Sequence, residues 1–177
     1  MPSLSYDVLF FLVDPINSNP RLAVSVEFAS TVTLVGFLLK LGAAPLHQWV
    51  ADVYTGAHLF ITALFATAVK LVLFVVFCRI AYQFSGGSLI SFFAVSSLVV
   101  GTFLTIKQTE IKRFLAYSSI VHVGFLLIGD LSSGFVYVFT YILSSLLFFS
   151  VILTVQNSSS KEPVYLTDLR VLKRGGN

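Results

Sequence analysis

Residues 36–49, "GFLLKLGAAPLHQW", decide how the rest of this sequence is interpreted, because they place a charge and a helix breaker in one apolar run. Lys40 lies inside the run, and Pro45 follows five residues later. Proline has no amide hydrogen, and its ring clashes with the carbonyl four residues before it. A broken helix persists at membrane depth where it lines a polar cavity or is enclosed by protein. We therefore expect Gly42 and Pro45 to interrupt a membrane helix just after Lys40.

Two interpretations of Lys40 follow from this break. In the first, the opened backbone admits water beside the lysine, its charge becomes tolerable, and Lys40 takes up and releases protons. In the second, Pro45 merely kinks the helix and the lysine side chain extends to the membrane surface. The first interpretation is favoured because the break and the charge then compensate each other.

The composition assigns the chain to the integral membrane proteins. Of its 177 residues, 56% are hydrophobic and only 11% are charged, with a mean hydropathy of +0.92. A soluble domain of this length could not cover its surface with so few charges. The apolar residues fall in long blocks without the alternation of a β-barrel, so an all-α membrane fold is predicted. The single cysteine excludes an internal disulfide, and the scattered histidines lack the spacing of a zinc site.

The domain organisation follows from these blocks. We predict a polar and interfacial N-terminal segment over 1–21, a membrane domain over 22–155 and a polar tail over 156–177. The stretch "VLFFLV" at 8–13 is too short to cross a membrane and is expected at the interface or against another subunit. Five transmembrane helices are expected in the membrane domain, at about 22–46, 57–82, 88–106, 114–129 and 134–155.

Basic residues are divided unequally between the loops on the two sides of this arrangement. One side carries Lys107, Lys112, Arg113, Lys161, Arg170, Lys173 and Arg174, and the other carries Arg21 and Arg79. The positive-inside rule then places the 107–113 loop and the C-terminus in the matrix or cytoplasm.

Lys70 lies near the middle of the second predicted span. It shares a helix face with small or weakly polar residues, Ala63, Ala66 and Thr67, and such faces pack against other helices. An unpaired lysine at that depth costs roughly 2.5–3.5 kcal/mol on insertion scales. A functional role for Lys70 is therefore favoured over a purely structural one.

His122 shares its helix face with Ser118 and Ser119, which could support it. A histidine in such a place either carries protons or is a hydrogen-bonded packing residue, and the residues alone leave both open. The chain has no phosphate-binding loop, no haem histidine pair, no cysteine cluster and no nucleophile elbow. It is therefore expected to hold no cofactor or metal and to perform no redox or hydrolytic chemistry itself.

Four segments in order resemble one family: "KLGAAPLHQWVADVYTGA", "TAVKLVLFVVFCR", "KQTEIKRFLAYSSIVHVGFLLIG" and "YLTDLRVLK". The resemblance is to the antiporter-like membrane subunits of proton-pumping NADH dehydrogenase, respiratory complex I, and most closely to the subunit 2 type. It covers nearly the whole chain after the N-terminal segment.

The resemblance implies a fold of two inverted repeats. This chain would form the seventh to eleventh transmembrane helices of that fold, and another chain would supply the other helices. Lys40 corresponds to the central lysine of the broken seventh helix, Lys70 to the lysine of the eighth, and His122 to a histidine of the tenth. In the family these positions belong to a proton relay along the membrane midplane.

The resemblance also implies the setting. The chain would be a core membrane-arm subunit of NADH:ubiquinone oxidoreductase, taking part in proton translocation coupled to electron transfer. NADH, FMN, iron–sulfur clusters and ubiquinone would bind elsewhere in the complex, and the partners would be other membrane-arm subunits and lipids, with no nucleic acid. The first twenty residues contain no lysine or arginine, unlike a secretory or mitochondrial leader. An organelle-encoded protein of the mitochondrial inner membrane is therefore expected, with the bacterial plasma membrane as the alternative.

Three other functions remain open at this point. A related multisubunit cation/proton antiporter or hydrogenase would share the pattern of lysines and proline. A purely structural membrane-arm fragment would pump nothing, although retention of Lys40 and Lys70 argues against it. A small stand-alone channel is disfavoured because no acidic residue lies at the depth of these lysines.

Overall fold

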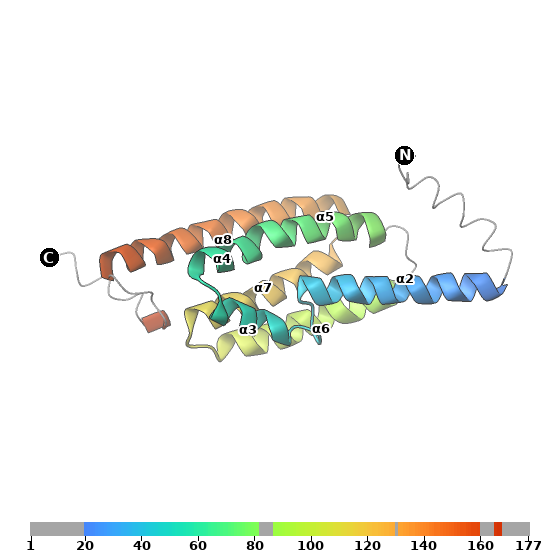
Figure 1. Ribbon diagram of the computed structural model, residues 1–177, viewed down its shortest axis with the longest axis horizontal. Coiled ribbons are helices and arrows are strands. Elements are labelled where there is room, and N and C mark those ends of the chain that lie inside the picture. Colours follow the sequence, from blue (N-terminus) through green and yellow to red (C-terminus); the bar gives the residue numbers. More distant parts are fainter. Residues whose placement is uncertain (1–19, 82–86, 130, 160–164, 168–177) are drawn as a thin grey trace. The chain divides into compact units, whose positions relative to one another are not determined.

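The computed structural model describes residues 20–81, 87–129, 131–159 and 165–167 (Figure 1). These residues are helical apart from short connections, which confirms the predicted all-α membrane fold. The chain divides into two units, one over 1–36 and one over 37–177. The described part of the first unit is the beginning of helix α2, and all other elements belong to the second.

The helices follow one another with short connections. Between Leu59 and Ala81 the chain is one continuous helix that contains a single π-helical turn, η1, directly before Lys70. The elements in order are α2 (Pro20–Leu41), α3 (Gln48–Gly56), α4 (Leu59–Leu64), η1 (Phe65–Val69), α5 (Lys70–Ala81), α6 (Gly87–Ile106), α7 (Ile111–Ile128) and α8 (Leu131–Ser159).

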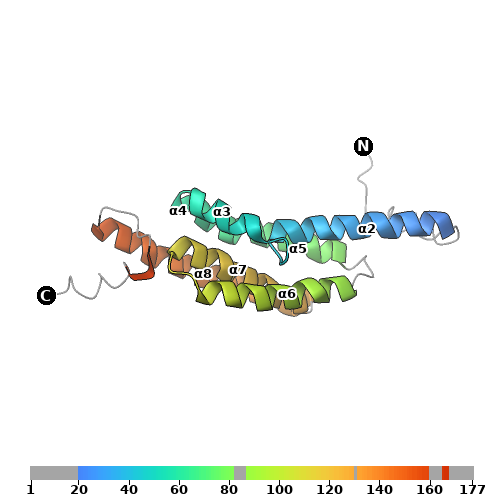
Figure 2. The same ribbon diagram turned by 90° about the horizontal axis from the view of Figure 1, so that it is seen from below.

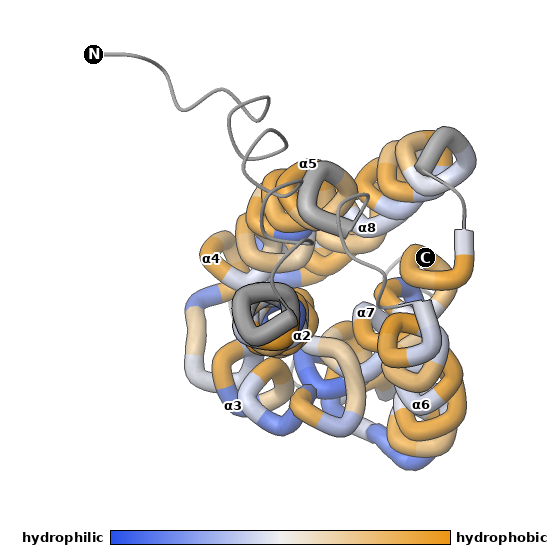
Figure 3. The backbone as a smooth tube through the Cα atoms, turned by 90° about the vertical axis from the view of Figure 1, so that its right-hand side faces the viewer, coloured by the Kyte–Doolittle hydropathy of each residue, from blue (hydrophilic) through white to orange (hydrophobic). Residues whose placement is uncertain are grey.

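Four helical segments of the described chain are long and apolar enough to cross a membrane: Leu59–Cys78, Gly87–Ile106, Ile111–Ile128 and Ser133–Asn157. They correspond to the second to fifth predicted spans. Figure 3 shows hydrophobic residues along most of α5, α6 and α8, whereas α3 includes hydrophilic positions.

Two span predictions need comment. The predicted fourth span, 114–129, begins about one turn earlier, at Ile111. The first predicted span, 22–46, corresponds to α2, which ends at Leu41; that α2 crosses the membrane stays a prediction. The apolar stretch at 8–13 and most of the tail lie outside the described residues, and the predicted domain limits stay predictions.

Helices α6 and α7 lie side by side over their length (Figure 1 and Figure 2). Two glycines permit this approach. A Cβ atom on Gly101 would lie 2.8 Å from Cγ2 of Val121, and one on Gly124 would lie 3.0 Å from the carbonyl oxygen of Ala94. Small residues at such contacts let helix backbones come close where lipid provides no hydrophobic drive.

The main core cluster joins α3, α4, η1, α7 and α8. Its buried members are Val50, Ala51, Tyr54, Leu59, Ala66, Ile111, Ala116, Phe149 and Ile152. A second, smaller cluster joins α5, α7 and α8 through Phe74, Cys78, Leu126 and Val138. The packing of α3 on α7 and of the α4–α5 helix on α8 brings the interior faces of these helices together.

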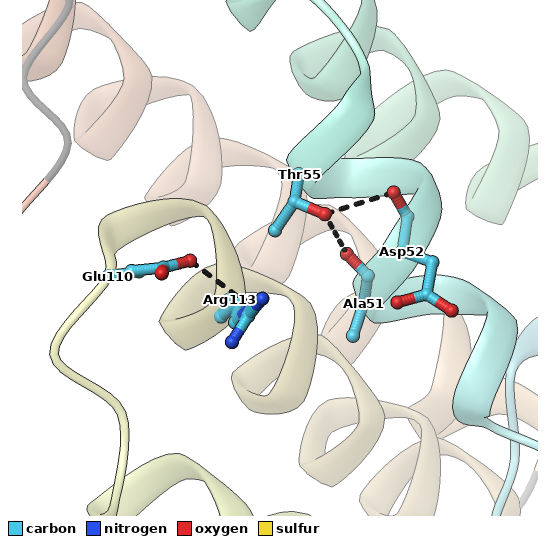
Figure 4. Close-up of polar contacts among 5 residues, drawn as sticks. All are labelled: Ala51, Asp52, Thr55, Glu110 and Arg113. Carbon is cyan, nitrogen blue, oxygen red and sulfur yellow. Dashed lines mark hydrogen bonds and ion pairs between the residues drawn. The ribbon is translucent and has the colours of Figure 1, made fainter.

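Polar contacts tie the start of α7 to its neighbours. The Lys112 ammonium group donates a hydrogen bond of 2.9 Å to the carbonyl of Ala57, at the end of α3. Glu110 and Arg113 form an ion pair of 3.1 Å, and Thr55 hydrogen-bonds within α3 (Figure 4). Lys112 and Arg113, predicted as topology signals, therefore also make structural contacts.

A short piece of the tail reaches the same region. The amide of Leu166 donates a hydrogen bond of 2.9 Å to the carbonyl of Thr109, and the Leu166 side chain packs on the main core cluster. The 107–113 loop and this tail piece thus lie together, as expected for segments on one side of a membrane. Which side they face stays a prediction.

Candidate functional site

The break after Lys40 lies between α2, which ends at Leu41, and α3, which begins at Gln48. It contains both predicted residues, Gly42 and Pro45. Gly42 has a φ angle of +80°, and a Cβ atom there would lie 2.6 Å from Cγ2 of Val50. The backbone conformation and the lack of space both require glycine.

Local hydrogen bonds close the end of α2. The amide of Gly42 donates to the carbonyl of Leu39, and the amide of Ala43 donates to the carbonyl of Leu38, both at 3.0 Å. This pair of bonds is a Schellman C-cap, the usual end of a helix at glycine. The indole nitrogen of Trp49 also donates to the Leu39 carbonyl, at 3.0 Å, and links α3 to the end of α2.

Two serines of α6 form hydrogen bonds with the backbone of Ala44, inside the break. The amide of Ala44 donates to Oγ of Ser97 at 2.8 Å, and Oγ of Ser96 donates to the carbonyl of Ala44 at 2.6 Å. Buried backbone polar groups without partners are costly in a membrane, so these bonds make the break tolerable. Neither serine was predicted from the sequence, although the pair Ser96–Ser97 in an otherwise apolar span was the available signal.

Lys40 lies in the last turn of α2, and its side chain is exposed on the described surface. Lys40 is paired with no carboxylate among the residues that the structure describes. The next residue, Leu41, lines a small cavity together with residues of α5, α7 and α8, whereas Lys40 does not line it. The structure therefore does not bring Lys40 together with the other predicted relay residues.

Lys70 occupies the junction between η1 and α5 and points toward α7. Its ammonium nitrogen donates a hydrogen bond of 3.1 Å to the backbone carbonyl of Ser119. It also lies 5.7 Å from the ring centroid of Tyr141, within the range of a cation–π interaction. Ala66 and Thr67, on the face that was predicted to pack, are both buried.

His122 lies on α7, one turn after Ser119, and contacts two tyrosines of α8. Its Nδ1 atom shares a hydrogen bond of 2.7 Å with the hydroxyl of Tyr137, and its ring centroid is 4.8 Å from that of Tyr141. Tyr141 therefore lies next to both Lys70 and His122. Lys70 and His122, predicted separately, are thus parts of one cluster.

A small cavity lies within this cluster. Its volume is about 20 Å³, enough for roughly one water molecule. The lining residues come from the end of α2 and from α5, α7 and α8, and they are Leu41, Lys70, Leu71, Ser119, His122, Val123, Leu126, Tyr137, Val138, Tyr141 and Ile142.

The two predicted supporting serines have different surroundings. Ser119 is buried; its hydroxyl donates to the carbonyl of Ala116 at 2.6 Å, while its own carbonyl holds Lys70. Ser118 is partly buried and does not line the cavity. Ser119 therefore belongs to the cluster. It contributes its backbone carbonyl, whereas the sequence had suggested a role for its side chain.

The sequence analysis also missed the tyrosines. Tyr137 and Tyr141 are four residues apart on one face of α8, and this spacing in an apolar helix was the available signal. Together with Lys70 and His122 they provide four neighbouring groups that can donate or accept protons in hydrogen bonds. Lysine and histidine can in addition change charge, so the arrangement suits proton transfer within a membrane.

Residues 10–174 match the family described as NADH:quinone oxidoreductase/Mrp antiporter, transmembrane. The matched range includes the break, Lys70 and the α7–α8 contacts.

Individual proteins also resemble the chain. A protein of Acidithiobacillus ferrooxidans named NADH-quinone oxidoreductase subunit N is 39% identical over 165 residues, which cover 86% of this chain and 34% of that protein. A protein of Marchantia polymorpha named NADH-ubiquinone oxidoreductase chain 2 is 34% identical over 151 residues, covering 79% of this chain and 30% of that protein. The chain thus spans about a third of the length of these curated relatives.

Proposed function

We propose a function from one premise: the chain belongs to the NADH:quinone oxidoreductase/Mrp antiporter transmembrane family. In this proposal it is part of an antiporter-like membrane-arm subunit of a proton-translocating NADH:quinone oxidoreductase, and basic side chains of its membrane helices carry protons. The names of the relatives from Acidithiobacillus ferrooxidans and Marchantia polymorpha support the assignment to that complex.

The position of Lys70 is the observation that supports the proposal best. Its ammonium group sits inside a membrane span on a backbone carbonyl, 3.1 Å away, with an aromatic ring as its second neighbour. A carboxylate partner would keep Lys70 protonated, because loss of the lysine's charge would leave the buried carboxylate uncompensated. A carbonyl and a ring stabilise the charge less, so both the protonated and the neutral lysine are accessible.

His122 provides the second basic group of the relay. Two basic groups that interact electrostatically disfavour joint protonation. A proton that arrives at Lys70 therefore favours release of a proton from His122, and the reverse also holds. Moving one charge against the membrane potential costs about 2.3 kcal/mol per 100 mV. A repulsion of similar size between the protonated forms of Lys70 and His122 is therefore sufficient to direct proton transfer.

Lys40 takes part in the relay at the broken helix. Its side chain is exposed on the described helices, which suits a group whose partner lies on another part of the fold. We propose that a carboxylate and water from further helices of the fold, on the same or another polypeptide, surround Lys40 in the assembled complex. Other membrane-arm subunits and lipids cover the exposed apolar faces.

The proposed setting follows from the same assignment. NADH, FMN, iron–sulfur clusters and ubiquinone bind to other subunits, and this chain supplies proton transfer without a cofactor of its own. We propose the mitochondrial inner membrane as its location, supported by the relative of Marchantia polymorpha that is named for ubiquinone. The bacterial plasma membrane is the alternative, supported by the similar bacterial proteins.

The test is substitution of Lys70 in membranes that contain the whole complex. For Lys70→Ala we expect an assembled complex on native gels and measurable NADH oxidation, but reduced proton uptake. Lys70→Arg is expected to reduce proton uptake as well, because arginine keeps its proton. Lys107→Ala, which removes an exposed lysine outside the spans, is the matched control and should pump normally. Full pumping by an assembled Lys70→Ala complex would refute the proposed function.

A further inference from the structure

Tyr54 lies on α3, the helix that follows the break, and its side chain is buried in the main core cluster with 2% of its surface exposed. Its hydroxyl group is buried and has no hydrogen-bond partner among the residues that the structure describes. A buried hydroxyl without a partner is a net cost to a fold, because water has been removed and nothing replaces it. Phenylalanine would fill the same space without that cost.

The hydroxyl of Tyr54 is nevertheless close to the Lys70 cluster. It lies near enough to Ser119 for their side chains to interact, and Tyr141 is its electrostatic neighbour on α8. The Oγ atom of Ser119 donates its own hydrogen to the carbonyl of Ala116 and keeps lone pairs that can accept another. Ser119 Oγ can therefore accept a hydrogen bond from the Tyr54 hydroxyl.

We propose that Tyr54 is a positioning residue for Lys70, whose hydroxyl bonds to Ser119 Oγ in one state of the protein and so orients the Ser119 carbonyl that holds the ammonium group. The inference rests on the proposed function and deepens it. It explains why a tyrosine occupies a position where phenylalanine would pack at least as well.

The same contact connects the broken helix to the buried lysine. α3 begins directly after the break, and Tyr54 of α3 brings its hydroxyl close to Ser119. A shift of α3 at the break thus changes the hydrogen bond between Lys70 and the Ser119 carbonyl, and it does so without any contact between Lys40 and Lys70. Proton transfer at the two lysines becomes coupled through α3, Tyr54 and Ser119.

The first experiment compares Tyr54→Phe with Lys70→Ala in the whole complex in membranes. Tyr54→Phe is expected to assemble normally and to lose about half or more of the proton uptake per NADH oxidised that Lys70→Ala loses. The matched control is Tyr117→Phe, because Tyr117 also packs on the main core cluster but does not line the cavity. The control should pump normally, and normal pumping by Tyr54→Phe would overturn the inference.

The route through Ser119 is tested by a double-mutant cycle. If Tyr54 acts through Ser119, then Tyr54→Phe combined with Ser119→Ala pumps no worse than Ser119→Ala alone. Losses that simply add would show that Tyr54 acts by another route and would overturn the inference.

A structure of the assembled complex gives a readout that is independent of pumping and of the variants' assembly. In at least one state the Tyr54 oxygen should lie about 3 Å from Oγ of Ser119. A hydroxyl that pairs elsewhere in all states would overturn the inference, whatever Lys70 does. Loss of pumping in Lys70→Ala but not in Tyr54→Phe would refute this inference alone, whereas full pumping by Lys70→Ala refutes the proposed function.

Discussion

The ammonium group of Lys70 is held by the backbone carbonyl of Ser119, 3.1 Å away on a helix that begins more than forty residues later in the chain. This bond joins the α4–α5 helix to α7 at the position where α7 also carries His122. It places a chargeable side chain against a neutral partner, which is the arrangement that the proposed proton relay requires. The following predictions test this arrangement and the helix break beside it.

Removing the hydroxyl of Tyr137 should weaken the relay at His122. The hydrogen bond of 2.7 Å fixes the orientation of the imidazole ring, and Tyr137→Phe frees it. We expect normal assembly and reduced proton uptake per NADH oxidised, with a smaller loss than in His122→Phe. Tyr165→Phe, at an exposed tyrosine outside the spans, is the control. Equal pumping by wild type and both His122 and Tyr137 variants would exclude the pair from proton transfer.

Substitution of Lys40 should separate assembly from pumping. Because its side chain is exposed on the described helices, Lys40→Ala removes no described packing and should assemble on native gels. Proton uptake should fall in Lys40→Ala and also in Lys40→Arg, since arginine does not release its proton. An assembled Lys40→Ala complex that pumps fully would contradict a relay role and leave Lys40 as a surface residue.

Gly42→Ala should destabilise the break. Alanine at φ +80° costs about 1–2 kcal/mol, and its Cβ atom would lie 2.6 Å from the Val50 side chain, so the total is larger. We expect less assembled complex and a lower temperature of inactivation. Gly36→Ala is the matched control, because a Cβ atom at that helical glycine meets nothing within 4 Å. Equal heat resistance of the two variants would contradict the structural role of Gly42.

Ser97→Ala should also weaken the break, from the side of α6. The Ser97 side chain is fully buried and accepts the amide hydrogen of Ala44 at 2.8 Å. Its loss leaves a buried amide without a partner, which costs about 1–3 kcal/mol. Ser91→Ala, at an exposed serine that bonds only within α6, should have little effect on thermal inactivation of the complex. A Ser97 variant as stable as the Ser91 variant would show that another group pairs with Ala44.

The sequence by itself determined the helical membrane fold, the position of the break and the candidates Lys70 and His122. Long apolar blocks allow only helices or barrels in lipid, and proline and glycine act on the backbone of their own segment. These effects are local, so they can be seen in a single stretch such as residues 36–49. The sequence placed the start of the fourth span at 114, whereas the helix begins at Ile111, because Ile111 packs in the main core cluster and the charged residues after it remain helical.

Only the tertiary structure decided which groups meet. Ser97 reaches Ala44 across 53 positions, and Lys70 reaches Ser119 across 49, because α6 and α7 pack closely at glycines and α7 faces α5 and α8. The carbonyl of Ser119 carries no signal in the sequence, since every residue has one. The same packing left Lys40 exposed, although its motif was the strongest in the chain. A sequence motif reports the chemistry of its own segment. A site between helices is formed by contacts among several helices, and these contacts depend on which helix faces pack together.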